Sequence, residues 1–200
     1  MAAGQSRRMG VPKLSIPLGD KGPLGGMALR EAAQSGLDDI FVVTRSGERP
    51  DWYPFAEGEA AGERCFLIPA PEAELGMALS IRAGLSAAAD NGPYDAVVVL
   101  LADQPLLRAD MIDRLLAAYR ADPSLEFAAW ADRGEARPPV LFAASVFDTL
   151  RRLAGDEGAR KLLTGSRLRG KLLEGEAAWF TDLDTPLEVK LFIERYVRSG

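Results

Sequence analysis

The chain has 200 residues, a formal net charge of −5 and a hydrophobic content of 48%, which fits one α/β domain of ordinary globular composition. Its acidic balance argues against general nucleic-acid binding. It contains no histidine and one cysteine, which excludes a Ser–His or Cys–His relay, histidine-ligated zinc and internal disulfides. With no signal peptide and no apolar run near 20 residues, we expect a cytoplasmic protein with no membrane partner.

The first element is a loop of small residues that ends in cations. Ala2, Ala3, Gly4 and Ser6 allow a close backbone approach to a ligand, and Arg8 and Lys13 follow. Backbone N–H groups and fixed cations together suit a triphosphate. The alternative is an ordinary Ala/Gly turn with solvated arginines.

Apolar runs and helical patterns alternate along the rest of the chain. Strands are expected at residues 40–43, 65–68, 96–101, 127–130, 139–142 and 179–180. Helices are expected at residues 27–35, 76–90, 110–119, 144–153, 159–163 and 186–197, the first with Gly36 as C-cap. This alternation predicts βαβ units and a mostly parallel sheet with helices on both faces, as one domain over residues 1–200.

Phosphate loops of this kind follow a hydrophobic strand, whose end aims the loop at the ligand. Only Met1 precedes the loop in this sequence. We therefore expect the first strand of the sheet to be missing from the chain, with Met1 in the place of its last apolar residue. A usual strand length predicts roughly five to eight further residues upstream.

Two aspartate motifs lie where a nucleotide-bound metal would be held. Asp103 follows the most apolar strand, and ligands of open α/β sheets bind at the carboxyl ends of strands. Asp182 and Asp184 alternate in a later extended segment, and either could face Asp103 across Mg²⁺, which takes one or two carboxylates plus phosphates. The alternatives are that Asp103 caps the following helix and that Asp184 or Thr185 caps the last one.

The third helix opens with Gly76 and carries Ser80 in its first turns. Exposed N–H groups at a helix start can contact a base or ribose, which makes Ser80 a candidate nucleotide ligand. An ordinary amphipathic helix is the competing interpretation.

Four motifs occur in order along the chain: the loop from Ala2 to Lys13, residues 101–105 around Asp103, residues 155–160 and residues 182–186. Together they resemble the MobA-like nucleotidyltransferases. Within these, the chain is most similar to the molybdenum cofactor cytidylyltransferases and the PucB purine-catabolism proteins.

The resemblance implies a Rossmann-like three-layer nucleotidyltransferase domain. It implies transfer of CMP from CTP to Mo-molybdopterin with release of pyrophosphate, in support of a hydroxylase such as xanthine dehydrogenase. By position, the nucleotide loop would comprise Ala2, Ala3, Gly4, Ser6 and Arg8, with Lys13 on the triphosphate and Asp103 and Asp184 on Mg²⁺. Ala3 favours CTP, because guanylyltransferases of the family usually have glycine there.

On the acceptor side, the resemblance places Arg137, Asp156 and Arg160. The family usually has Gly-His-Pro where this chain has Arg137-Pro138-Pro139, so its acceptor contacts differ. Two other functions stay open: a related nucleotidyltransferase with another phosphate acceptor, and a non-catalytic carrier that hands the cofactor to an apo-hydroxylase.

Overall fold

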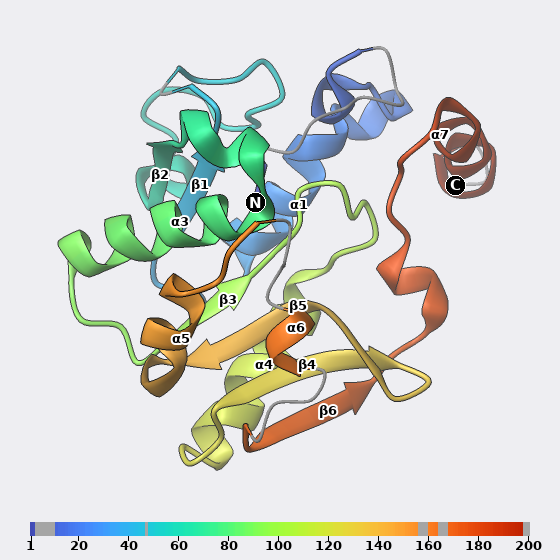
Figure 1. Cartoon of the computed structure of the whole chain (residues 1–200). Helices are drawn as coiled ribbons and strands as arrows, with labels where there is room; N and C mark the ends of the chain where they lie inside the picture. The colour runs from blue at the N-terminus through green and yellow to red at the C-terminus, as the bar shows by residue number, and fades with distance from the viewer. Residues whose placement is uncertain (3–10, 47, 156–159, 164–167, 198–200) are drawn as a thin grey trace.

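The computed structural model describes residues 1–2, 11–46, 48–155, 160–163 and 168–197. Its strands form two groups, a parallel pair and a four-stranded sheet in the order β3-β5-β4-β6 (Figure 1). The strands are β1 (Ile40–Thr44), β2 (Cys65–Pro69), β3 (Ala96–Val99), β4 (Phe127–Asp132), β5 (Glu135–Ala143) and β6 (Gly170–Glu174).

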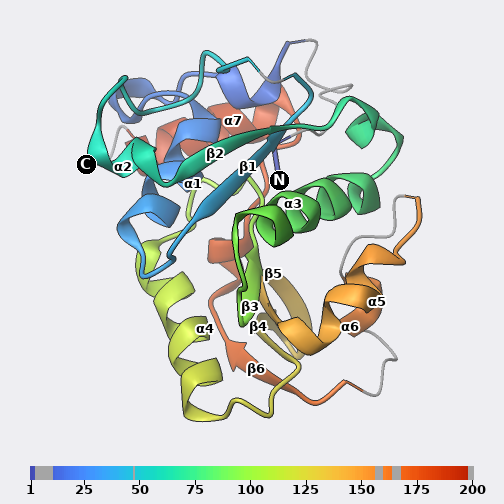
Figure 2. The ribbon, with the colours of Figure 1, turned by 90° about the vertical axis from the view of Figure 1, so that its left-hand side faces the viewer.

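Helices cover both faces of these strands, as Figure 2 shows, with α1 and α4 on one side and α3 and α5 on the other. The helices are α1 (Leu24–Gln34), α2 (Ala60–Glu63), α3 (Met77–Asn91), α4 (Ala109–Ala121), α5 (Phe147–Arg151), α6 (Arg160–Leu163) and α7 (Pro186–Phe192). Their apolar faces pack on the strands because each element must bury one face. The expected layered α/β architecture is therefore confirmed.

The runs with the strongest apolar character form strands as predicted, although β3 ends at Val99 rather than at residue 101. The strand predicted at residues 179–180 is wrong: those residues belong to a 3-10 helix, Ala177–Phe180. The apolar character of Trp179 serves packing, because its ring meets Trp130 edge-on at 5.4 Å. The last strand is β6, and Gly170 at its start lies so close to the Phe127 ring that a Cβ would overlap it.

β5 runs antiparallel to both neighbours, while β1–β2 and β4–β6 are parallel pairs. β4 and β5 form a hairpin whose turn residues Arg133 and Gly134 both have positive φ, 52° and 78°. This is the geometry of a two-residue turn that matches the twist of paired strands. The alternation of strands and helices does not reveal this hairpin.

Three predicted helices differ in their limits. α1 begins at Leu24 and its C-cap is Ser35 rather than Gly36. The helix expected over residues 144–153 is a 3-10 turn followed by α5, and the one expected over 186–197 is α7 followed by a π turn at Ile193–Val197.

Met1 and Ala2 lie between β1 and β3, where they connect the two groups of strands. The Met1 amino group donates to the Leu100 carbonyl at 3.0 Å, and the Ala102 N–H donates to the Met1 carbonyl at 3.1 Å. On the other side the Ala2 N–H donates to the Val43 carbonyl at 3.1 Å. Met1 and Ala2 thus bridge β1 and β3, which do not pair with each other.

Candidate active site

Three segments far apart in the sequence converge on the ammonium group of Lys13. It lies 2.6 Å from Asp103 Oδ2 and 2.7 Å from Asp184 Oδ1. Exposure of the side chains rises from 14% for Lys13 to 25% for Asp103 and 44% for Asp184, so the cluster forms the floor of an open site. The structure therefore brings together the cation and both carboxylates that the sequence singles out.

Lys13 begins a short 3-10 helix, Lys13–Ser15, that follows the N-terminal loop. The Ile16 N–H donates to the Lys13 carbonyl at 3.2 Å, and the Ser15 hydroxyl donates to Asp51 at 2.6 Å. These contacts fix the backbone from which the long Lys13 side chain reaches the two carboxylates.

Asp103 lies in the segment between β3 and α4. The residue before it, Ala102, donates its N–H to the Met1 carbonyl, and the residue after it, Gln104, is buried. The N-cap of α4 is Arg108, with no side-chain capping bond. Asp103 thus does not cap a helix, and its carboxylate faces Lys13.

Asp184 is oriented by the start of α7. Thr185 is the N-cap and forms a capping box with Glu188, and Pro186 occupies the first turn. The Glu188 carboxylate also accepts the Asp184 N–H at 2.8 Å. Thr185, not Asp184, therefore caps the helix, which leaves the Asp184 carboxylate to bind Lys13.

Electrostatics support a cationic Lys13 in this cluster. Burial alone would lower its pKa, but the hydrogen bonds and charges of Asp103 and Asp184 outweigh it, so the pKa is raised. In the neighbouring Asp182, by contrast, the surroundings disfavour the charged form. Desolvation of its carboxyl, followed by the negative charge of Asp103, raises its pKa to about 6, although the residue as a whole is exposed.

Asp103 and Asp184 form a donor set that fits a hard divalent cation. Two carboxylates already share one positive charge, and Mg²⁺ binds through one or two carboxylates while waters and phosphates complete its shell. Among the described residues there is no cluster of three or more His, Cys, Asp or Glu side chains suited to a metal.

A cavity of about 520 Å³ opens beside Lys13 and is large enough for part of a nucleotide. Arg45, directly after β1, lines it together with Thr44 and Ser46. Sequence reasoning missed Arg45. The available signal was a cation at the carboxyl end of a parallel strand, the edge at which such sheets bind ligands.

Of the other predicted site residues that the structure describes, Ala2 lines the cavity beside Lys13, whereas Ser80 and Arg137 lie elsewhere. Ser80 is only 4% exposed and faces the space between β1 and β3, and Arg137 on β5 pairs with Glu135 at 3.3 Å. The remaining predictions, which concern Ala3, Gly4, Ser6, Arg8, Asp156 and the Arg160 side chain, fall outside the described residues.

Comparison with known proteins identifies the family. Residues 1–172 match the MobA-like NTP transferase domain. The chain belongs to this family. It is 37% identical to the purine catabolism protein PucB of Bacillus subtilis, over 94% of this chain and 91% of that protein. It is 30% identical to a molybdenum cofactor guanylyltransferase of Mesorhizobium japonicum, over 81% of this chain and 74% of that protein.

Solved structures agree with this MobA-like fold. Rv0371c of Mycobacterium tuberculosis superimposes with a TM-score of 0.77 and 25% identity, over 96% of this chain and 95% of that one. Its complex with manganese gives a TM-score of 0.71 and 22% identity, over 94% of each chain. The Rossmann-like nucleotidyltransferase fold is thereby confirmed, and no helix in the described residues is long and apolar enough to cross a membrane.

Proposed function

We propose that this chain is a molybdenum cofactor cytidylyltransferase that transfers CMP from CTP to Mo-molybdopterin with release of pyrophosphate. The observation that carries the proposal is the convergence of Asp103 and Asp184 on Lys13. The relatives named PucB and molybdenum cofactor guanylyltransferase support the choice of acceptor. We place the activity in a single cytoplasmic domain over residues 1–200.

The reaction is a nucleotidyl transfer between phosphates. A terminal phosphate oxygen of molybdopterin forms a bond to the α-phosphorus of CTP. The bond between that phosphorus and the oxygen that bridges the α- and β-phosphates breaks, and pyrophosphate leaves. The attacking oxygen is already anionic near neutral pH, so no general base is required. Such a reaction depends mainly on positioning and charge neutralisation, which agrees with a chain that has no histidine.

Lys13 and Arg8 would offset the charge that develops on the departing pyrophosphate. Arg45, directly after β1, lines the cavity beside Lys13 and adds a further positive charge there. Asp103 and Asp184 would hold Mg²⁺, which supplies further charge neutralisation at the phosphates when bound. The Lys13 ammonium and the metal need the same two carboxylates. With a metal held by Asp103 and Asp184, the Lys13 side chain would be available to the triphosphate instead.

The N-terminal loop would form the nucleotide site, with Ala2, Ala3, Gly4 and Ser6 against the phosphates and base. Ser80 is buried on α3 and does not line the cavity at Lys13, so it is left out of this proposed site. Ala3 favours cytosine over the larger guanine. The acceptor site would include Arg137, Asp156 and Arg160. Arg137 lies on β5 and is about one-third exposed, so it is free to exchange its Glu135 partner for a phosphate.

Two other functions fit the chain less well. A carrier that delivers the cofactor to apo-xanthine dehydrogenase would not need a cation between two carboxylates beside an open cavity. A nucleotidyltransferase for a sugar or alcohol phosphate would use the same triphosphate site. The relation to a molybdenum cofactor guanylyltransferase favours the molybdenum cofactor as acceptor, and the relation to PucB favours a client hydroxylase of purine catabolism.

Pyrophosphate release separates these functions. The purified chain is incubated with Mg²⁺ and CTP, GTP or ATP, either alone, with Mo-molybdopterin, or with a panel of sugar and alcohol phosphates. The proposal predicts release only with CTP plus Mo-molybdopterin. Release with another acceptor indicates the second function, and cofactor binding without any release indicates the carrier.

A further inference from the structure

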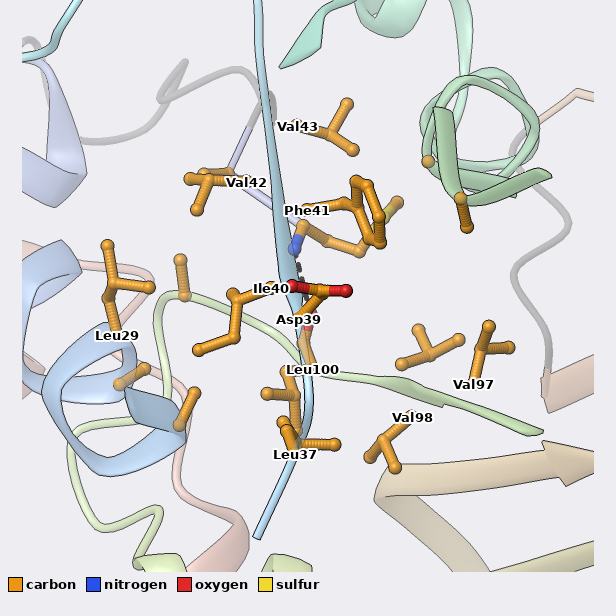
Figure 3. Close-up of a pocket in the computed structure, with 18 of the residues that line it drawn as sticks. Leu29, Leu37, Asp39, Ile40, Phe41, Val42, Val43, Val97, Val98 and Leu100 are labelled. Atoms are coloured by element: carbon orange, nitrogen blue, oxygen red, sulfur yellow. Dashed lines mark hydrogen bonds between the residues drawn. The ribbon is translucent and has the colours of Figure 1, made fainter. Parts of the chain in front are cut away.

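A cavity of about 610 Å³, which we call the Arg30–Arg108 cavity, lies between α1, the segment before α4 and the residues on either side of α7. Ligand pockets span roughly 300–1,000 Å³, so a small molecule fits. Among the described residues, none lines both this cavity and the one beside Lys13. It also differs from the apolar space between β1 and β3, which Val43, Val97 and Val98 line (Figure 3).

Positive charge predominates in the Arg30–Arg108 cavity. Its cations are Lys21, Arg30, Arg108 and Arg195, and its carboxylates are Glu31 and Glu176. The Glu31 carboxylate accepts the Ala109 N–H at 2.8 Å, so it is committed to the start of α4. An excess of positive charge in one cavity of a chain with a net charge of −5 favours an anion at that place.

Arg108 is held in place by its neighbours. Its guanidinium lies 4.6 Å from the centre of the Trp179 ring, and its Nε and Nη2 donate to the Asp110 carboxylate at 2.8 and 3.2 Å. The Trp179 ring in turn meets Trp130 edge-on at 5.4 Å. Two of the five guanidinium N–H groups are used in this way, and the others are left for an anion. A guanidinium that is already oriented loses less conformational entropy when it binds a ligand.

Arg30 supplies a second guanidinium from α1. Its Nη1 donates to the Lys21 carbonyl at 3.0 Å, which ties the short 3-10 helix Gly19–Lys21 to α1. This bond uses one of its N–H groups. Guanidinium groups recognise phosphate and carboxylate oxygens through pairs of N–H groups. An anion inside the cavity therefore meets two guanidinium groups, those of Arg30 and Arg108.

The rest of the lining suits a flat ring. Trp179 and Tyr196 line the cavity, and Met27, Leu106 and Ala178 add apolar surface. Aromatic side chains and guanidinium planes stack on planar rings. A phosphate monoester carries about −1.5 to −2 charges at pH 7, which matches the excess of two positive charges in the lining. A nucleoside triphosphate carries more negative charge than these residues neutralise.

We propose that the Arg30–Arg108 cavity binds a planar aromatic ring that carries one phosphate monoester. Arg30 and Arg108 hold the phosphate oxygens, and the ring lies against Trp179. Pro105 lines the cavity two residues after Asp103, so the bound molecule also contacts the segment that carries one of the two carboxylates at Lys13. Neither nucleotide nor metal takes part, so this site does not depend on the proposed transfer reaction.

Pyridoxal 5′-phosphate is the probe, because it combines an aromatic ring, a phosphate monoester and an aldehyde. The aldehyde condenses with a nearby lysine amine to an imine, with loss of water, and borohydride reduces the imine to a stable amine. Peptide mass spectrometry then reports the labelling of each lysine in the full chain. Lys21 lines the cavity, and the exposed Lys171 and Lys190 serve as internal references.

At limiting probe, labelling of Lys21 is expected to exceed that of Lys171 and Lys190 by at least about tenfold, because the bound phosphate holds the aldehyde near it. Arg30→Gln and Arg108→Gln should each lower the labelling of Lys21 by at least about fivefold, because each removes charge-assisted hydrogen bonds to the phosphate. The matched control is Arg151→Gln, which changes a surface arginine paired with Asp148 and should leave the labelling unchanged.

Competition in the wild-type chain tests the ring and the phosphate separately, without any change to the fold. Phenyl phosphate should protect Lys21 at a concentration at least about tenfold lower than inorganic phosphate or benzoate does. CTP with Mg²⁺ should protect Lys13 and not Lys21, so failure of the proposed nucleotide site would appear at Lys13 alone. Equal labelling of Lys21, Lys171 and Lys190, equal protection by the three anions, or full labelling in both arginine variants would overturn the proposal.

Discussion

The Lys13 ammonium lies 2.6 Å from the Asp103 carboxylate, across 90 residues of sequence. The contact joins the end of the N-terminal loop to the segment after β3, and Asp184 completes it from the start of α7. A lysine held by two carboxylates is a pre-formed cation site. A divalent ion and Lys13 must therefore compete for the same oxygens unless a triphosphate takes the lysine.

Because of this competition, Lys13→Ala is expected to raise the affinity for Mn²⁺ and to lower the affinity for CTP. Without nucleotide, Mn²⁺ is expected to bind about tenfold more tightly, because both carboxylates lose their resident cation. CTP is expected to bind at least about tenfold more weakly, because the triphosphate loses its lysine. Isothermal titration measures both, with the exposed Lys21→Ala as the matched control; weaker binding of both ligands would contradict the account.

Thr185→Ala tests the link between the α7 cap and Asp184. Loss of the capping box is expected to cost about 1 kcal/mol of unfolding free energy. It should also weaken metal binding, because the Thr185 hydroxyl donates to the Glu188 carboxylate that in turn holds the Asp184 N–H. Asp184→Asn should weaken metal binding while the cap stays intact. Denaturant titration measures the free energy of unfolding of both variants. If Asp184→Asn lowers it by about 1 kcal/mol and Thr185→Ala does not, the assignment of Thr185 as the cap is wrong.

The raised pKa of Asp182, about 6, predicts a pH dependence of metal binding. As the pH rises from 5 to 7 this carboxyl loses its proton and adds a negative charge beside Asp103 and Asp184, so divalent-ion affinity should increase. The pKa of Asp182 in the folded chain, about 6, exceeds its usual value of 3.8. Its contribution to the free energy of unfolding therefore falls as the pH rises from 3.8 to about 6. Asp182→Asn should flatten both profiles; an unchanged metal-affinity profile in that variant would refute this role.

Ala3→Gly tests nucleotide choice. Removal of one methyl group is expected to raise kcat/KM for GTP by about tenfold and to leave that for CTP within about threefold, since one methylene in a pocket is worth roughly 10–200-fold. Steady-state pyrophosphate release with each nucleotide measures the ratio. A parallel change for both nucleotides would show that Ala3 does not determine the base.

Local patterns predict much of this fold because apolar runs are direct signals of buried strands. β1 and β2 are found where the sequence places them. The sequence also singles out Lys13, Asp103 and Asp184, although it does not predict that the lysine pairs with both carboxylates. β6 escapes prediction because its Gly-Lys-Leu-Leu-Glu sequence is mostly exposed and has no β-branched residue. Its place depends on the close approach of Gly170 to Phe127, a contact between distant segments.

The site residues also fall into some that the local sequence reveals and others that only the fold reveals. Nothing local distinguishes a capping Asp184 from a ligand, and only the capping box of Thr185 and Glu188 decides between them. Arg45 is an ordinary arginine after a strand until the fold places it beside the cavity at Lys13. Such residues are recognised from tertiary geometry, because their partners lie in segments that sequence periodicity cannot connect.

Electron paramagnetic resonance of Mn²⁺ reports how much of the ion is bound, with and without CTP. CTP and Mn²⁺ are expected to bind together to the wild-type chain, each tightening the other at least about tenfold. Asp103→Asn is expected to abolish this coupling while CD shows an intact fold. Coupling of normal strength in Asp103→Asn would contradict the claim that Asp103, Asp184 and Lys13 form a metal–triphosphate site.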